Sequence, residues 1–438
     1  LFATAQIGWK ESLYLDLTAR NDWSSTLANT KSEGSGFFYP SVGVSWILNQ
    51  TLNLPSWISF GKVRASWAQV GNDLPIGITS PAQTITAGGV VNPIDYYFAE
   101  DLKPEISTSI EFGTEWRFFN SRLDFDFTFY RTDTKNQLIR VNTTAEKRRF
   151  RWINAGKIRN TGIEVTVATP LMNDNFRWKT QFNFATNKNE IVSLGGTPSF
   201  QYASGNVSMP YKMMVVEGGS LGDIYGNVFV RDESGKILLE PATDKDGNEN
   251  KNAGLPQVTT DKAAKIGNFN PDWTLGWSNT LTYKGFSLYF LIDTRMGGDV
   301  ISLTQAGLDY AGVSKATGDA RAAKRYMLEG QEIKNVQGFY QMVGDRGNGT
   351  TEFYRYDGTN IRLRELSLGY SFPQQMLEKT GFIKGVDLSL VARNLFFIYK
   401  DAPFDPDATM SVGNDNQGLD TYGMPSTRNI GFNIKLTF

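Results

Sequence analysis

Apolar and polar side chains alternate strictly over long stretches of this chain. Residues 123–129 read Leu-Asp-Phe-Asp-Phe-Thr-Phe, and residues 430–438 read Ile-Gly-Phe-Asn-Ile-Lys-Leu-Thr-Phe. Because successive side chains of a β-strand point to opposite sides, each such stretch carries one apolar and one polar face. The pattern predicts an all-β protein made of amphipathic strands, with helical periodicity confined to residues 316–328 and 373–379.

Two architectures use strands of this kind. A soluble β-sandwich buries the apolar face in a core, whereas a transmembrane barrel turns that face to lipid and the polar face to the lumen. The stretches reach the length of a tilted membrane-spanning strand, about 9–11 residues, while strands of soluble proteins average about 5–6 residues. Trp and Phe stand near many strand ends, as in the aromatic girdles of membrane barrels. These features favour a transmembrane antiparallel β-barrel.

The connections between the predicted strands give an independent criterion. Thirteen strands are expected, at residues 1–9, 13–23, 38–48, 58–71, 106–119, 122–136, 159–170, 176–188, 272–283, 286–296, 360–372, 385–396 and 428–438. Every second connection is short, and the long ones fall near residues 24–37, 72–105, 137–158, 189–271, 297–359 and 397–427. Outer-membrane barrels show this asymmetry, with tight periplasmic turns and long extracellular loops, and a sandwich has no reason for it.

The number of strands bears on what precedes residue 1. Bacterial single-chain barrels have an even number of strands and begin from the periplasm, whereas thirteen is odd. We therefore expect an odd number of strands before Leu1. A barrel of 22 strands would leave nine of them, and any plug of the lumen, outside this chain.

One predicted strand changes phase along its length. Ile361 and Leu363 begin the apolar face, but the apolar positions of residues 366–372 continue on the opposite parity. A β-bulge near Arg364–Glu365 would keep a single lipid-facing side. The alternative is that the strand leaves the membrane before Glu365.

Composition excludes several kinds of chemistry. The 438 residues include no Cys and no His, which rules out cysteine nucleophiles, thiolate zinc sites and His-based triads. The 44 Lys and Arg nearly balance 45 Asp and Glu, so no nucleic-acid partner is implied. The alternating acids and amides of residues 244–250 lack the glycine and glutamate positions of an EF-hand calcium loop. We expect no enzymatic activity, no cofactor and no metal.

Short motifs follow one another in a fixed order over nearly the whole chain. They are Phe-Tyr-Pro-Ser at residues 38–41 with Trp46, Arg-Ala-Ser at 64–66 with Gly-Asn at 71–72, Asn-Ala-Gly at 154–156 with Asn-Thr-Gly-Ile-Glu at 160–164, Asn-Pro-Asp-Trp at 270–273, Ile-Arg-Leu-Arg-Glu-Leu-Ser-Leu-Gly-Tyr at 361–370, Ala-Arg-Asn-Leu at 392–395, Phe-Asp-Pro at 404–406 and Tyr-Gly-Met-Pro at 422–425. In this order they resemble the C-terminal barrel portion of SusC/RagA-type TonB-linked outer-membrane transporters.

The resemblance implies a location and a mode of action. It places residues 1–438 in the barrel of a multi-pass protein of a Gram-negative, Bacteroidota-like outer membrane, with the plug domain and TonB box outside this chain. It implies TonB-dependent nutrient import, energised through the TonB complex by the N-terminal part. It also implies a SusD-like lipoprotein seated on the extracellular loops, for which residues 189–271 and 297–359 are the natural docking surfaces by length.

The polar strand faces supply candidate lumenal residues, and we take most of them to form salt bridges within the wall. They are Glu111, Glu115, Arg117, Asp124, Asp126 and Arg393. Asp124 and Asp126 lie about 7 Å apart on one strand, a separation that glycosidases use but that any acids at alternate strand positions share. The mixed sign of the lumenal charges gives no field selective for one ion type and favours a neutral solute.

Loop aromatics are the candidate substrate contacts, because sugars offer apolar faces for stacking. They are Tyr96, Tyr97, Trp152, Tyr202 and Tyr211, although loop aromatics more often pack the loop itself. The resemblance also implies that the terminal Phe438 is the outer-membrane assembly signal. The alternative is a girdle aromatic, and the two roles are compatible.

Three functions fit these observations. The first is import of oligosaccharides, with oligopeptides as the alternative within the same family. The second is a surface receptor or adhesin that transports nothing, and the third is a passive porin without a plug. The sequence does not name the substrate.

Overall fold

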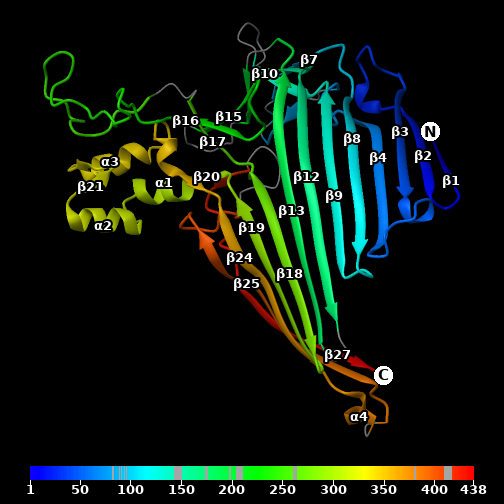
Figure 1. Ribbon diagram of the computed structural model, residues 1–438. Helices are drawn as coiled ribbons and strands as arrows, with labels where there is room; N and C mark the ends of the chain where they lie inside the picture. Colours follow the sequence, from blue (N-terminus) through cyan, green and yellow to red (C-terminus); the bar gives the residue numbers. More distant parts are fainter. Residues whose placement is uncertain are drawn as a thin grey trace.

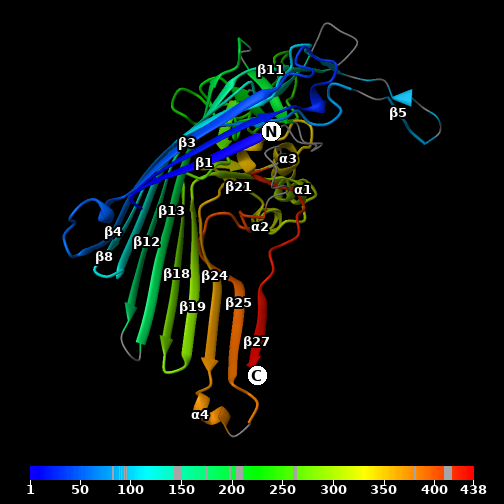
Figure 2. The ribbon, with the colours of Figure 1, turned by 90° about the vertical axis from the view of Figure 1, so that its right-hand side faces the viewer.

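The computed structural model describes residues 1–438 except 81, 82, 88, 90, 93, 95, 143–149, 173–175, 197–198, 204–210, 260–263, 379–380 and 409–416. Long antiparallel strands form one curved sheet in which each strand pairs with the next long strand along the chain (Figures 1 and 2). In order they are β1 (Phe2–Trp9), β2 (Leu13–Asp22), β3 (Phe37–Ile47), β4 (Ile58–Asn72), β8 (Glu105–Phe118), β9 (Leu123–Lys135), β12 (Lys157–Met172), β13 (Phe176–Ser193), β18 (Trp273–Tyr283), β19 (Phe286–Met296), β24 (Asn360–Ser371), β25 (Gly385–Lys400) and β27 (Asn429–Thr437).

These thirteen strands confirm the thirteen that the alternation predicts. Most ends agree within two residues, but β13 continues to Ser193 and β25 to Lys400. Both strands extend at the end that carries the long loops, where the chain no longer alternates between apolar and polar side chains. Continued pairing with neighbouring backbone, rather than a membrane, explains the extra length there.

All the short turns lie at one end of the sheet, here the short-turn end, and all the long connections at the other, the long-loop end (Figure 1). The turn between β18 and β19 consists only of Lys284 and Gly285, with φ of 45° and 89°. Two positive φ values are typical of the two-residue turn whose twist matches that of a β-hairpin.

The phase change in β24 is a β-bulge, as predicted. Leu363 pairs with Ile292 and Glu365 with Leu291, so Arg364 is the extra residue on this strand. The register shifts at the same place against β25. The bulge keeps the apolar residues on one side and turns both Arg364 and Glu365 toward the polar face, where they form ion pairs.

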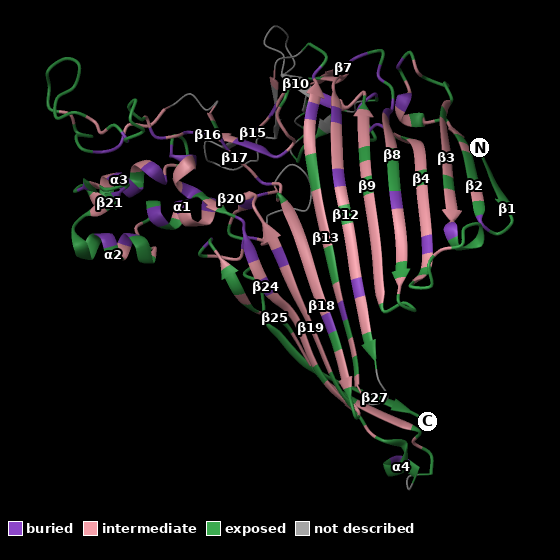
Figure 3. Cartoon of the chain, viewed as in Figure 1, coloured by how far each residue is buried: buried purple, intermediate pink, exposed green. Residues whose placement is uncertain are grey.

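The register places apolar side chains on one face of the sheet and polar side chains on the other. Phe112, Phe129 and Ile163 lie side by side on one face of β8, β9 and β12, and their neighbours Gly113, Thr128 and Glu164 lie on the other. Phe112 is 48% exposed, which is unusual for a large aromatic residue in a soluble core. Fully buried residues instead gather in the helices and short strands at the long-loop end (Figure 3).

The long connections contain their own secondary structure. The short strands are β5 (Thr84–Ile85), β6 (Val91–Asn92), β7 (Tyr96–Phe98), β10 (Leu138–Asn142), β11 (Phe150–Asn154), β14 (Ser199–Ala203), β15 (Tyr211–Val216), β16 (Asp223–Gly226), β17 (Ala264–Asn268), β20 (Asp299–Ser302), β21 (Tyr326–Leu328), β22 (Gln331–Ile333), β23 (Arg355–Asp357) and β26 (Leu419–Asp420). Their helices are α1 (Leu303–Tyr310), α2 (Lys315–Ala323) and α3 (Val336–Val343), with 3-10 turns at Ser25–Leu27 and Thr351–Tyr354. Helix α4 (Gln374–Leu377) and the 3-10 turn at Leu48–Gln50 lie in connections at the short-turn end.

The helical predictions were correct only in part. Helix α2 ends at Ala323, not at 328, because Lys324 adopts a left-handed conformation with φ of 54° and the chain then enters β21. Helices α1 and α3 were not predicted, although Ser302 and Asn335 cap their first turns by accepting backbone N–H bonds. No helix among the described residues is long and apolar enough to cross a bilayer.

Candidate functional site

The polar face of the sheet carries the charged residues singled out in the sequence. On the two neighbouring strands β8 and β9, Glu115 lies opposite Asp126 and Arg117 opposite Asp124. Glu111 lies further along the same face of β8 and is exposed. This face is the inner side of the curved sheet if the apolar face contacts lipid.

A guanidinium crosses one strand to bind the next but one. Arg64 on β4 donates to Asp126 on β9 at 3.1 Å and to the Thr128 hydroxyl at 2.6 Å, so it spans β8. The strand between them offers Gly113 at this point, and a Cβ there would lie 2.5 Å from the Arg64 Nε. The absence of a side chain at Gly113 therefore leaves the space that the Arg64 side chain occupies.

Three of the other predicted lumenal residues, Glu115, Arg117 and Arg393, also form local pairs. Arg117 donates to Glu115 at 2.9 Å on the same strand, and Arg393 on β25 donates to Glu365 on β24 at 3.1 Å. Among the described residues, the Asp124 Oδ1 is buried and has no hydrogen-bond partner. Pairing within the wall is thus the arrangement of most of these charges, while their contact with a substrate stays a prediction.

A buried ion network that sequence reasoning missed lies next to the bulge. Arg362 is only 3% exposed, binds Asp405, and lies 3.6 Å from Asp407. Arg364 binds Asp407 at 3.1 Å and Asp293 on β19. The chain that follows β25 is therefore folded back and held against β24, and the Phe-Asp-Pro motif at residues 404–406 was the available signal.

A small neutral cavity opens on the polar face at the long-loop end. Its volume is about 230 Å³. Asn160 accepts amide bonds from Asn187 at 3.1 Å and from Asn189 at 3.0 Å, so three asparagines on β12 and β13 form its wall. The remaining lining is Met213, Met214, Val215, Leu221, Gly222, Phe269, Asn270 and Gln417. No charged side chain appears among these described lining residues.

Two long connections fold together into one unit, here called the loop domain and made of residues 227–258 and 303–354. Its core takes Phe229, Ile237 and Leu255 from the first segment and Ala306, Ala320, Leu328, Ile333, Phe339, Tyr340, Val343 and Tyr354 from the second. In Figure 1 the loop that follows β16 lies against α1 and α3. The core is therefore shared between the two segments.

Polar contacts also join the two segments of the loop domain. The Phe229 amide donates to Glu352 at 2.9 Å, and Arg231 binds Glu329 at 2.6 Å and Glu352 at 3.2 Å. The hydrogen bond from Arg231 holds the pKa of Glu329 below its ordinary value. These contacts fix the orientation of the first segment on the second.

The interior of the loop domain contains one carboxylate. Asp309 is 2% exposed and accepts a hydrogen bond from the Gln305 amide at 2.8 Å. Burial raises its pKa above the ordinary value, because the charged form is poorly solvated there. Burial likewise raises the pKa of the nearby Tyr356 to about 12.

The candidate aromatics are divided among different places. Trp152 on β11 packs against a small core with Leu102 and Phe98, and the Tyr96 hydroxyl donates to the Gly77 carbonyl at 3.0 Å. Tyr97 lies beside Tyr96 on β7, which pairs in parallel with β11. The backbones of Tyr202 and Tyr211 belong to β14 and β15, but their side chains lie outside the described residues. Stacking on a sugar stays a prediction for all five.

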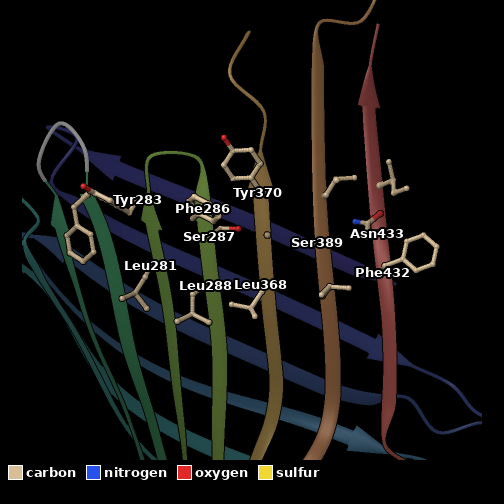
Figure 4. Close-up of a pocket in the computed structure, with 15 residues that line it drawn as sticks. Leu281, Tyr283, Phe286, Ser287, Leu288, Leu368, Tyr370, Ser389, Phe432 and Asn433 are labelled. Carbon is tan, nitrogen blue, oxygen red and sulfur yellow. The ribbon is translucent and has the colours of Figure 1, made fainter. Parts of the chain in front are cut away.

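The apolar face is hollowed near the short-turn end of β18, β19, β24, β25 and β27 (Figure 4). Leu281, Leu288 and Leu368 lie side by side there, and Phe432 on β27 is 75% exposed. Phe438 follows β27, is 65% exposed and stacks on Phe382 at 6.2 Å between ring centroids. A continuous exposed apolar face of this size is a surface for lipid acyl chains.

Amphipathic strands with tight turns at one end, long folded loops at the other, an apolar outer face and a charged inner face define an outer-membrane β-barrel wall. Residues 1–395 match the family model described as TonB dependent receptor-like, beta-barrel, and the chain belongs to this family. It is therefore an outer-membrane protein. Barrels of this kind have tight turns on the periplasmic side and long loops on the extracellular side, and we propose the same orientation for this chain.

Individual relatives agree with this assignment. TonB-dependent receptor P3 of Formosa agariphila is 25% identical over 473 residues, covering 100% of this chain and 45% of that protein. TonB-dependent receptor SusC of Bacteroides thetaiotaomicron is 24% identical over 425 residues, covering 90% of this chain and 40% of that protein. The solved RagAB peptide importer in its closed-closed state superposes with a TM-score of 0.76 at 20% identity, covering 100% of this chain and 47% of that one. The chain spans less than half the length of these relatives, and the structural likeness shows a shared fold.

Proposed function

We propose that the intact protein imports a neutral oligomeric nutrient across the outer membrane in a TonB-dependent manner. Membership of the TonB-dependent receptor family carries the proposal. The wall supports it, because its charges are largely paired with one another, as Arg64 is with Asp126, and leave no field of one sign. A pore selective for simple ions would need such a field.

The substrate class that we favour is oligosaccharide. The cavity beside Asn160 offers amide groups and apolar side chains without a charge, which suits hydroxyl rims and the apolar faces of sugars. Oligopeptides are the second candidate, since asparagine side chains can also pair with peptide main chain. The likeness to the RagAB peptide importer is the observation that keeps this candidate open.

A SusD-like surface lipoprotein is the proposed partner, and the TonB complex the proposed source of energy. The loop domain is the proposed docking surface for the lipoprotein, because it is the largest folded extracellular unit among the described residues. Its joined segments present a single rigid body instead of two independent loops. A receptor or adhesin on the same barrel would use this surface without moving a solute.

An uptake assay with the full-length protein tests energised import. Uptake of a fluorescent neutral oligosaccharide by cells is expected to stop when a protonophore removes the proton-motive force. Uptake that persists under the protonophore contradicts energised import, and surface binding without any uptake supports the receptor function.

Substrate class is tested by calorimetric titration against neutral oligosaccharide and oligopeptide panels. Asn160→Asp places a charge at the neutral cavity and is expected to weaken binding of the preferred panel at least tenfold. Asn252→Asp, the same change in an exposed turn of the loop domain, serves as the matched control. Equal affinity of the two variants would show that the cavity is not the binding site.

A further inference from the structure

The outer face of the barrel changes character abruptly near the extracellular end of β9. Along this face Phe125, Phe127 and Phe129 follow one another, and the next outward positions are Arg131, Asp133 and Lys135. Phe129 and Arg131 are successive outward residues, so no neutral polar side chain separates the apolar part of this face from the charged part.

The two neighbouring strands make the same change at the same height. On β12 the outward residues above Ile163 are Thr161, Arg159 and Lys157, and on β13 those above Phe184 are Thr186, Lys188 and Glu190. The register places Arg131 opposite Thr161, Asp133 opposite Arg159, and Lys135 opposite Lys157. Arg131, Lys135, Lys157, Arg159 and Lys188 therefore form one continuous basic patch, which lies at the upper ends of β9, β12 and β13 in Figure 1.

The carboxylates within this surface do not neutralise it. Asp133 alone holds three of the cations, with Arg159 at 2.7 Å, Arg131 at 3.3 Å and Lys157 at 3.4 Å. Glu190 is the second acid, opposite Arg159. Five cations against two carboxylates leave a formal surplus of three positive charges on the outside of the barrel.

One pair within the patch calls for an anion. Lys135 and Lys157 lie directly opposite each other on adjacent strands, where like charges destabilise a sheet. Asp133, 3.4 Å from the Lys157 ammonium and shared with two arginines, offsets only part of this charge. On its other side Lys135 neighbours Ile106, which brings no compensating charge. An anion placed between the two ammonium groups would convert repulsion into attraction.

We infer that the basic patch binds the phosphate groups of the phosphorylated glycolipid that forms the outer leaflet of the outer membrane. The apolar face just below the patch fixes the depth of the acyl chains, so a headgroup phosphate lies at the height of Lys135 and Lys157. Guanidinium and ammonium groups clustered at the edge of a membrane span attract anionic headgroups in this way. Free phosphate offers the same chemistry, but the position of the patch at the lipid boundary favours the lipid.

The test uses the full-length protein, purified in detergent and incubated with lipid A carrying two phosphates or with dephosphorylated lipid A. Native mass spectrometry then gives the fraction of protein bound to each. Wild type is expected to prefer the phosphorylated form. Each surface cation contributes roughly fivefold to such binding, so Lys135→Gln with Lys157→Gln should reduce the preference about 25-fold.

The matched control is Lys284→Gln with Lys384→Gln, which removes two exposed lysines from the periplasmic end of the barrel and should leave the preference unchanged. Heat-dependent migration on gels verifies that both variants are folded barrels. No preference in wild type, or a preference retained after loss of Lys135 and Lys157, overturns the inference. Inorganic phosphate that binds at the patch while lipid A does not would overturn the assignment to lipid. The outcome does not depend on whether the protein transports anything.

Discussion

Truncation of Phe339 tests whether the loop domain is one cooperative unit. The Phe339 side chain is 0% exposed, and its ring centroid lies 4.8 Å from that of Tyr326, 5.2 Å from Tyr340 and 5.4 Å from Phe353. Removing a fully buried phenyl ring leaves a cavity and typically costs about 3–5 kcal/mol. Phe339→Ala is therefore expected to lower the local unfolding free energy of the loop domain by about that amount.

The effect should reach the other segment of the loop domain. Phe353 contacts both Phe339 and Phe229, with 6.3 Å between the centroids of Phe229 and Phe353. Hydrogen exchange of the full-length protein should show protection lost by about two orders of magnitude or more in both 227–258 and 303–354. The barrel strands should keep their protection, because their hydrogen bonds do not involve this core.

Met327→Ala is the control, because this residue is 51% exposed on β21 in the same segment. A surface truncation of this kind is expected to change stability by no more than about 0.5 kcal/mol. If Phe339→Ala leaves protection in 227–258 unchanged, the two segments do not share a core and the reasoning fails.

Three further predictions concern other parts of the chain. Gly113→Ala should displace Arg64 from Asp126 and destabilise the barrel by about 1–3 kcal/mol, seen as a lower temperature for loss of heat-dependent gel migration; an unchanged temperature would mean that the crossing contributes nothing. Asp309→Asn should stabilise the loop domain at pH 8 but much less at pH 4. Burial raises the pKa of Asp309, so above this raised pKa the folded state bears the cost of a buried charge. That cost disappears as the pH falls toward the ordinary pKa of an aspartate. Hydrogen exchange corrected for intrinsic rates measures this difference, and an equal effect at both pH values contradicts it. Deleting Phe438 should sharply lower the amount of full-length protein in the outer membrane, and an unchanged amount on immunoblots of membrane fractions would refute its role in assembly.

The membrane-spanning part was readable from sequence because lipid imposes a rigid rule on it. Outward residues within the bilayer are predominantly apolar, so alternation marks each strand, and a break in parity such as that between Leu363 and Leu366 marks a bulge. The same rule made the polar positions of Glu115 and Asp126 predictable. Their exact partners were not, because Arg64 reaches Asp126 across an intervening strand.

The loops obey no comparable rule, and there prediction largely failed. The core of the loop domain is assembled from short elements of two separate connections, so no single stretch shows a long period. The cap residues Ser302 and Asn335 were visible, but helices of eight residues carry a weak periodic signal. The Arg362 network depends on a chain that folds back after β25; the Phe-Asp-Pro motif at residues 404–406 marked this segment but did not indicate its partner.

The shared core of the loop domain also constrains the order in which the protein can mature. Its two segments are separated along the chain by the β18–β19 hairpin. One segment precedes the hairpin and the other follows it, so both must reach the long-loop end before they can pack together. The side chains of Phe229, Ile237 and Leu255 are therefore covered only when both segments stand on the same side of the hairpin. A chain that lacks residues 303–354 would leave these apolar side chains exposed, so the first segment is not expected to keep its fold without the second.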